Sequence, residues 1–172
     1  MPLERWDLLN SAGDKTGQTI WRGNPLRQGQ YHLVVHVWIV NASGALLIQK
    51  RAPFLCLMPG IWAVTGGSAV SGEIGEVAAL RELAEELGIF PAEGALRCLG
   101  QLRRRNSHCE VWRMQFDSTA TELSLQADEV AQVRWVCWDT LMAMVAVGTF
   151  HNYGKGYFDW LKTRLYGDGA CE

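Results

Sequence analysis

Residues 66–89, GGSAVSGEIGEVAALRELAEELGI, constrain the fold more than any other stretch of this 172-residue chain. Gly66 and Gly67 open the stretch, and a segment with helical periodicity follows them. The pattern predicts a helix from about Ile74 to Leu87, with Gly88 in the left-handed conformation that commonly follows a helix end. At about 100° per residue, one side of this helix is apolar, and we expect it to pack on the rest of the protein. The residues on that side are Val77, Leu80, Leu83, Ala84 and Leu87.

The opposite side of the predicted helix is acidic. Glu82, Glu85 and Glu86 point the same way within one turn, and Arg81 lies at the border. Neighbouring carboxylates repel one another, and a purely solvated face would carry Lys or Arg four residues away. A hard divalent cation such as Mg²⁺ would also relieve the repulsion, because it takes oxygen ligands. For the helix alone an acidic solvent face remains the alternative, whereas the preceding glycines and Glu73 favour the cation.

Read from Gly67, the stretch has the pattern G-x5-E-x7-R-E-L-x-E-E-x-G-I without departures, and it resembles the complete Nudix box. Nudix proteins are mostly Mg²⁺-dependent hydrolases, with Mn²⁺ as a further option, that cleave a diphosphate linked to some moiety X. The approach to the box, MPGIW followed by GG, is also similar to many members of the family. The resemblance implies an enzyme that hydrolyses a nucleoside diphosphate derivative or a related small-molecule diphosphate.

The resemblance also implies roles for residues of the box. Glu85 and Glu86 would bind the metal, and Glu82 would be either a ligand or the base that accepts the proton of the attacking water. The backbone carbonyl of Gly66 would be a further ligand. Arg81 would orient the carboxylates, and the first glutamate of the box would brace the loop before the helix.

Hydrophobic periodicity predicts further elements on both sides of the box. We expect a β-hairpin within residues 6–22, and the apolar, β-branched run at residues 31–40 suits a central strand covered on both faces. Residues 52–65 read as a segment broken by Pro and Gly that leads into the box. Residues 139–147 read as a helix capped by Asp139. Other strands are predicted at residues 45–50, 96–105, 109–116 and 133–138, and a last helix at about residues 157–165.

This order of elements predicts a sheet covered by helices. The resemblance sharpens the expectation to the α/β/α Nudix fold, a mixed β-sheet sandwiched between α-helices. We expect a single domain over residues 1–172, with the hairpin as an N-terminal extension. Dimers are frequent in the family, so the resemblance leaves a homodimer open.

Composition excludes several classes of protein. Hydrophobic residues make up 48% of the chain and charged residues 20%, and the net charge is −2, so nothing attracts nucleic acid or an anionic membrane in bulk. No apolar run approaches the ~18 residues of a membrane span, and the N-terminus has no signal-peptide pattern. The five cysteines lack zinc-site spacing and read as reduced thiols, so we expect a cytoplasmic protein.

A diphosphate hydrolase needs more oxygen ligands than the box supplies, and Nudix enzymes commonly recruit a carboxylate from a later segment. Glu129, in ADEVAQVRWV, and Glu110, in CEVWRMQF, are the two candidates, with Asp128 weaker than either. A solvated loop residue is the alternative for Glu129. An outward-facing strand residue or a core ion pair is the alternative for Glu110.

Basic residues should contact the phosphates. Lys50 and Arg51 leave a strand just before the box loop and are candidates. Side chains alternate along a strand, so residues 103–105, RRR, cannot all face one site. We interpret this run as a solvated turn. His32 and His36 share one strand face. They read either as a buried, hydrogen-bonded pair or as a metal or substrate contact. Trp62 and Tyr153 are aromatic candidates for contacting X.

Two rival functions remain open. The phrase YHLVVHVWIVNASGALLIQKRA also resembles the isopentenyl-diphosphate isomerase branch of the superfamily, in which Glu110 would match the catalytic glutamate. That isomerase needs a catalytic cysteine just before the box, where this chain has WAVTGGS, and Cys56 lies too early. The second rival is a non-catalytic Nudix-like binding domain. Such domains usually lose box glutamates, and this chain keeps all of them.

Overall fold

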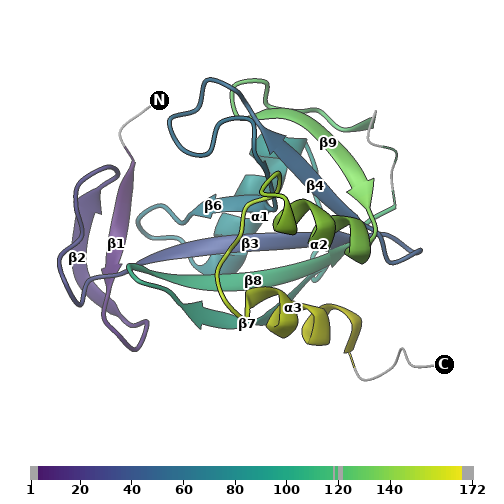
Figure 1. Ribbon diagram of the computed structural model, residues 1–172. Coiled ribbons are helices and arrows are strands. Elements are labelled where there is room, and N and C mark those ends of the chain that lie inside the picture. Colours follow the sequence, from purple (N-terminus) through teal and green to yellow (C-terminus); the bar gives the residue numbers. More distant parts are fainter. Residues whose placement is uncertain (1–3, 118, 120–121, 168–172) are drawn as a thin grey trace.

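The computed structural model describes residues 4–117, 119 and 122–167. The centre of the fold is β3 (His32–Val40), which is flanked on both edges (Figure 1). β3 runs parallel to β8 (Ser107–Gln115) on one edge. On the other edge it changes partner: it pairs antiparallel with β6 (Thr65–Ser68) along residues 34–37 and with β4 (Leu46–Arg51) at residues 39–40. Seven strands of the described chain form this mixed sheet, and the remaining ones are β5 (Trp62–Ala63), β7 (Leu96–Arg103) and β9 (Val130–Val136).

Helices cover both faces of the sheet. α1 (Gly75–Leu87) lies on one face, and α2 (Trp138–Ala146) and α3 (Tyr157–Tyr166) lie on the other (Figure 1). Side chains alternate along β3 and therefore supply two cores. Val35, Val37 and Ile39 belong to the α1 core, whereas Trp38 and Val40 belong to the α2–α3 core. The predicted α/β/α arrangement, with residues 31–40 as its central strand, is confirmed.

The ends of α1 agree with the prediction, and its buried face agrees in part, because Leu83 and Leu87 are buried as expected. Gly88 has φ 66° and ends the helix, as expected. Val77, however, is 47% exposed, while Glu82 and Glu86 are buried. The reason is that α1 packs against Gly66 and Gly67 at β6, where no side chains stand in the way of the two carboxylates.

One smaller expectation is wrong. Asp139 does not cap α2, because the helix begins one residue earlier and its N-cap is Cys137, without a side-chain hydrogen bond. The segment at residues 52–65 contains β5 and ends at Thr65, the first residue of β6, to which Gly66 and Gly67 also belong. Pairing of β6 with β3 fixes the two glycines on the edge of the central strand.

β1 (Arg5–Leu9) and β2 (Lys15–Trp21) form a separate two-stranded antiparallel sheet. This hairpin contacts the loop before α1. The Asp7 carboxylate accepts hydrogen bonds from Ser71 Oγ at 2.6 Å and from the Gly72 backbone N–H at 3.0 Å. Lys15 pairs with Asp7 at 2.8 Å and donates to the backbone carbonyl of Glu73 at 3.1 Å. No helix in the described part of the chain is long and apolar enough to cross a membrane.

Candidate active site

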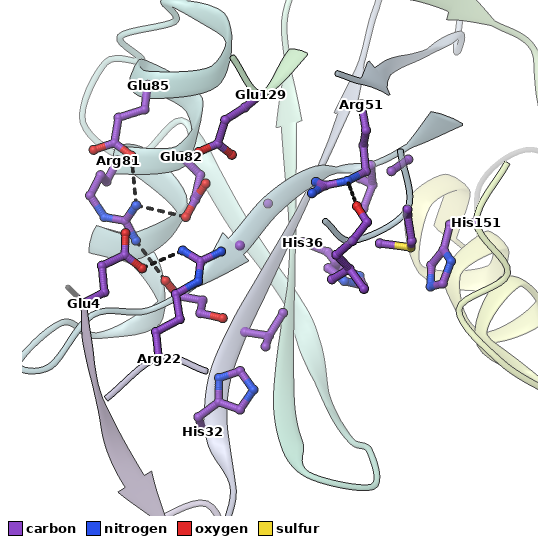
Figure 2. Close-up of a pocket in the computed structure, with 18 of the residues that line it drawn as sticks. Glu4, Arg22, His32, His36, Arg51, Arg81, Glu82, Glu85, Glu129 and His151 are labelled. Atoms are coloured by element: carbon purple, nitrogen blue, oxygen red, sulfur yellow. Dashed lines mark hydrogen bonds and ion pairs between the residues drawn. The ribbon is translucent and has the colours of Figure 1, made fainter. Parts of the chain in front are cut away.

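A pocket of about 440 Å³ lies beside β6 and the first half of β3, next to the end of β4 at Arg51 (Figure 2). Its walls come from both faces of the sheet. One side presents carboxylates from α1 and from the segment before β9, and the other side presents basic and aromatic groups. The acidic side includes Glu82, Glu85 and Glu129, with Arg81 and the Glu4–Arg22 ion pair beside them (Figure 2). The basic side includes Arg51, Arg104, His36 and His151.

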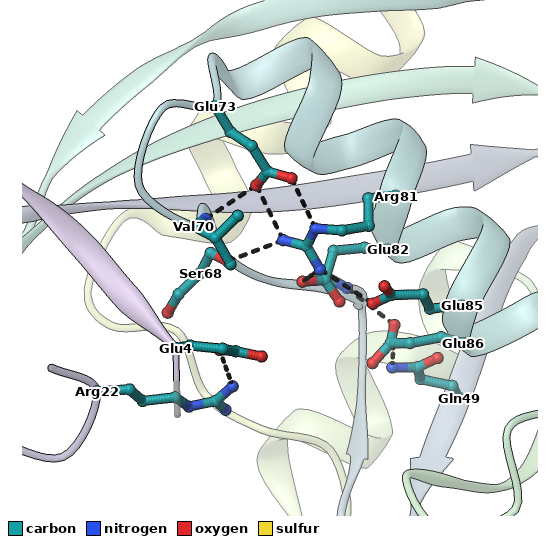
Figure 3. A network of polar contacts seen from close by, with 11 residues as sticks. Glu4, Arg22, Gln49, Ser68, Val70, Glu73, Arg81, Glu82, Glu85 and Glu86 are labelled. Atoms are coloured by element: carbon teal, nitrogen blue, oxygen red, sulfur yellow. Dashed lines mark hydrogen bonds and ion pairs between the residues drawn. The ribbon is translucent and has the colours of Figure 1, made fainter. Parts of the chain in front are cut away.

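Arg81 organises the acidic side (Figure 3). Its guanidinium donates to both carboxylate oxygens of Glu73, at 2.8 and 3.1 Å, and to the backbone carbonyl of Ser68 at 3.0 Å. Nη1 also contacts Glu82 at 2.9 Å and Glu85 at 3.0 Å. Glu73 in turn accepts from a backbone N–H of the loop, so the arginine ties the loop to the helix. These bonds raise the pKa of Arg81 even though burial opposes them.

The three acids of α1 differ in their surroundings. The side chain of Glu85 is 53% exposed, whereas Glu86 is only 2% exposed. Glu86 Oε2 accepts from Gln49 Nε2 at 2.9 Å and from the Gly66 N–H at 3.2 Å. Burial raises the pKa of Glu86 well above its usual range, and repulsion from Glu82 adds to the effect. Burial likewise raises the pKa of Glu82 to about 7, although Arg81 opposes it.

Two glycines make room for these acids. A Cβ on Gly67 would lie 2.3 Å from Glu82 Oε1, so only a residue without a side chain lets that carboxylate reach the pocket. A Cβ on Gly66 would lie 2.0 Å from the backbone oxygen of Val35, and Gly66 has φ +151°. The glycine pair therefore allows α1 to bring its carboxylates to the edge of β3.

The structure separates the two carboxylates proposed from outside the box. Glu129 lines the pocket together with Glu82 and Glu85. Glu110 does not line it: its carboxylate lies against Gly75 at the start of α1, where a Cβ would be 1.6 Å from Glu110 Oε2. Register explains this difference, because Glu110 pairs with Val35, which faces the α1 core rather than the pocket.

The donor chemistry of the acidic side fits a hard divalent cation. The residues Glu82, Glu85, Glu129 and Gly66 line one cavity and offer it carboxylate and carbonyl oxygens. A single arginine, Arg81, donates to both Glu82 and Glu85. As the side chains stand, no group of three or more His, Cys, Asp or Glu among the described residues is arranged to hold a metal ion. Arg81 Nη1 binds the Glu82 and Glu85 oxygens that such an ion would share.

The basic candidates also separate. Arg51 lines the pocket, whereas Lys50 does not. His32 and His36 both line it, and both are buried. His32 stacks on Trp6 at 4.1 Å between ring centroids. A residue that no sequence argument singled out, Arg104, lines the pocket as well.

Arg104 is the middle member of the basic run at residues 103–105, and its two neighbours are exposed. Strand alternation predicted that the three could not act together, but it did not indicate which of them faces inward. Tyr153 lines the pocket, whereas Trp62 does not and lies beneath the Arg134 guanidinium at 4.4 Å.

The family model that describes the NUDIX domain matches residues 30–161 of the chain. The chain belongs to the Nudix family. An uncharacterised Nudix hydrolase of Listeria monocytogenes is 39% identical over 152 residues, which cover 88% of this chain and 90% of that protein. This Nudix protein is therefore an enzyme of the hydrolase class that acts on diphosphate bonds.

Solved structures agree with the fold of this Nudix hydrolase. The crystal structure of DR0079 from Deinococcus radiodurans superposes with a TM-score of 0.77 at 28% identity, covering 95% of this chain and 99% of that one. The NUDIX domain of Shewanella oneidensis NrtR superposes with a TM-score of 0.58 at 18% identity, covering 84% of this chain and 92% of that one. At that identity the likeness to NrtR shows the fold alone.

Proposed function

We propose that this Nudix protein is a divalent-metal-dependent hydrolase that cleaves the diphosphate linkage of a nucleoside diphosphate derivative or a related X-linked diphosphate. One observation carries the proposal: Glu82 and Glu85 of α1, Glu129 from a distant segment and Gly66 of β6 all line one cavity of about 440 Å³. Cavities of this size hold small molecules of roughly nucleotide dimensions.

In this proposal Glu82 and Glu85 of α1 and the backbone carbonyl of Gly66 hold Mg²⁺ or Mn²⁺, whereas Glu86, which was also expected to be a ligand, does not line the pocket. A bound divalent ion of this kind offsets phosphate charge and lowers the pKa of water. Glu82 or Glu129 accepts the proton of the attacking water, since both carboxylates border the cavity. Arg81 holds Glu82 and Glu85 in place through Nη1 and anchors the loop through Glu73. Glu86 accepts a hydrogen bond from the Gly66 N–H and so holds the backbone of Gly66 in place.

The isomerase alternative gains no support from the pocket. That reaction needs an acid–base partner such as a cysteine, and none of the cysteines in the described part of the chain lines the pocket. Cys56 is exposed, and Glu110 lies outside the pocket. Hydrolysis is therefore the chemistry that the lining residues favour.

The test is a substrate screen followed by a matched pair of variants. Nucleotide sugars, dinucleotides and nucleoside di- and triphosphates are incubated with Mg²⁺ or Mn²⁺, and liberated phosphate or pyrophosphate is measured. ADP-ribose belongs in the panel, because the NrtR domain was crystallised with it. We expect at least one compound to be hydrolysed and the reaction to stop when EDTA is added.

Glu85→Gln should lower kcat by roughly 10² or more, because the loss of a ligand removes several kcal/mol of transition-state stabilisation. Glu85 is half exposed, so the fold should survive. Glu76→Gln is the control, since Glu76 lies on the same helix but outside the pocket. Equal rates for the two variants would refute the assignment.

A further inference from the structure

The side of the pocket opposite α1 carries a cluster of basic groups. Arg51 lies at the end of β4, Arg104 lies in the turn between β7 and β8, and His151 lies between α2 and α3. His36 comes from β3. Figure 2 shows Arg51, His36 and His151 across the pocket from the acids of α1.

Three of these groups contact one aromatic ring, that of Tyr153. The ring centroids of His36 and His151 lie 4.5 and 4.7 Å from that of Tyr153. Arg104 Cζ lies 5.6 Å from the same centroid, and Arg104 Nη2 donates to the Tyr153 backbone carbonyl at 3.1 Å. Tyr153 is itself fixed, because its hydroxyl accepts from the Val64 N–H at 3.0 Å. The cluster therefore has a rigid base.

Neither arginine of the cluster has a carboxylate partner among the described residues. Arg51 donates through Nε to the Leu57 carbonyl at 3.0 Å, and Arg104 donates through Nη2. A guanidinium has five N–H donors in a planar fork, so most donors of both side chains remain for a ligand. Two half-buried cations without a paired carboxylate are stabilised when an anion binds to both.

His36 adds a neutral donor. Trp38 Nε1 can only donate, and it donates to the Tyr157 hydroxyl at 3.0 Å. The hydroxyl hydrogen is then available to His36 Nδ1, which lies 2.7 Å away and accepts it. The neutral ring therefore carries its hydrogen on Nε2, the atom left for a ligand in the pocket. Burial, with smaller contributions from Arg104 and His151, lowers the pKa of His36 to about 3, so the ring stays neutral near pH 7.

We propose that Arg51, Arg104 and the Nε2–H of His36 form an oxyanion-binding subsite that holds a phosphate group of the substrate at the end of the pocket remote from the acids of α1. This inference rests on the proposed function for the identity of the substrate but not for the binding itself. The phosphate can come from two sources: the diphosphate's own distal phosphate, or an additional phosphate carried by X.

Binding in the presence of EDTA isolates this subsite. Without a metal ion the acids of α1 repel an anion, and the two arginines on their side of the pocket, Arg22 and Arg81, already pair with carboxylates. We therefore expect pyrophosphate to be retained by the basic side. Inorganic pyrophosphate is titrated into the full chain by calorimetry. We expect saturable binding, weakened at least roughly tenfold by Arg104→Gln, because hydrogen bonds to charged groups are worth that much.

Arg103→Gln is the matched control. Arg103 is the preceding residue and is exposed; its side chain donates to the Ser11 carbonyl at 3.4 Å and does not line the pocket. It should bind like the wild type. Arg51→Gln gives an independent reading if Arg104→Gln folds poorly. An unmodified protein that fails to bind pyrophosphate in EDTA, or folded Arg104→Gln and Arg51→Gln proteins that bind as well as Arg103→Gln, would overturn the subsite.

The source of the phosphate is read from a second titration in EDTA, with ADP-ribose and 2′-phospho-ADP-ribose. Tighter binding of the phosphorylated compound, lost in Arg104→Gln, assigns the subsite to a phosphate on X. Equal binding of both, weakened equally by Arg104→Gln, assigns it to the diphosphate. Failure of hydrolysis together with intact pyrophosphate binding would refute the proposed function and leave the subsite standing.

Discussion

Adding one methyl group at Gly67 should inactivate the enzyme without unfolding it. The new Cβ of Gly67→Ala would lie 2.3 Å from Glu82 Oε1 and 2.7 Å from Glu82 Cδ. Ordinary contact begins near 3.4 Å, so the carboxylate must move by about 1 Å. The carboxylate ends a flexible side chain and can move, whereas the backbone need not, because Gly67 does not have a positive φ. A displacement of this size at a reacting centre costs roughly 10² in rate.

Stability should change little in the same variant. Replacing Gly by Ala at an ordinary φ stabilises the fold by about 0.4–1 kcal/mol through the unfolded chain. Weakening the bond between Glu82 and Arg81 costs about 1.5–3 kcal/mol at most. The net loss should stay within about 2 kcal/mol, or roughly 4–8 °C in Tm for a chain of this size.

Gly66→Ala is the informative comparison. Its Cβ would lie 2.0 Å from the backbone oxygen of Val35, in the central strand, and its φ is +151°. No flexible side chain can absorb that contact, so the fold should be destabilised by more than about 3 kcal/mol. Thermal unfolding and kcat on the best substrate of the screen are measured for both variants. A Gly67→Ala enzyme with near-normal kcat, or equal losses of Tm in the two variants, would refute the reasoning.

Three further outcomes are expected. Arg81→Lys should lower the free energy of unfolding, measured in urea, by about 2–3 kcal/mol. A single ammonium cannot replace the planar guanidinium that joins the loop to α1. A loss below about 0.5 kcal/mol would contradict this. Asp7→Asn should cost about 1 kcal/mol at pH 7. Burial raises the pKa of Asp7, but hydrogen bonds from Lys15 and other donors outweigh burial and lower that pKa to about 2. The free-energy cost of Asp7→Asn should therefore shrink as pH falls from 4 towards 2. A cost that does not depend on pH would contradict the pairing of Asp7 with Lys15. Glu129→Gln should lower kcat by roughly 10² in the phosphate-release assay, whereas Asp128→Asn, at an exposed neighbour, should leave kcat unchanged. A larger loss of kcat in Asp128→Asn than in Glu129→Gln would exclude Glu129 from the catalytic site.

Local sequence signals predicted the fold well, because periodicity and end signals act over a few residues. The β-branched run at residues 31–40 favoured a strand covered on both faces, and Gly88 indicated the end of α1. The rotation of α1 was not predictable in the same way. Helical periodicity assigns a carboxylate to solvent, and only the contact with Gly66 and Gly67 shows why Glu86 is buried instead.

Carboxylates outside the box could be proposed but not ranked from sequence. Glu110 and Glu129 both stand in or beside strands, and each has apolar neighbours. What separates them is register: Glu110 pairs with Val35 and faces the α1 core, while Glu129 precedes β9 and reaches the pocket. Register depends on which strands pair, and pairing is a property of the whole sheet rather than of the local pattern.

The pocket is lined by residues from both faces of the sheet, and this explains why most residues of its basic side could not be predicted from a sequence motif. Glu82 comes from the α1 face, whereas His36 packs on Tyr157 of α3, on the opposite face. Both line the pocket beside β6, where the glycines leave room for the Glu82 side chain. A motif reports only residues that are close in the chain, and Arg104 and His151 reach the pocket from separate connections. The α1 carboxylates could therefore be read from one contiguous box, and Arg51 from its place beside that box, whereas Arg104 and His151 could be assigned to the pocket only once the strands were paired.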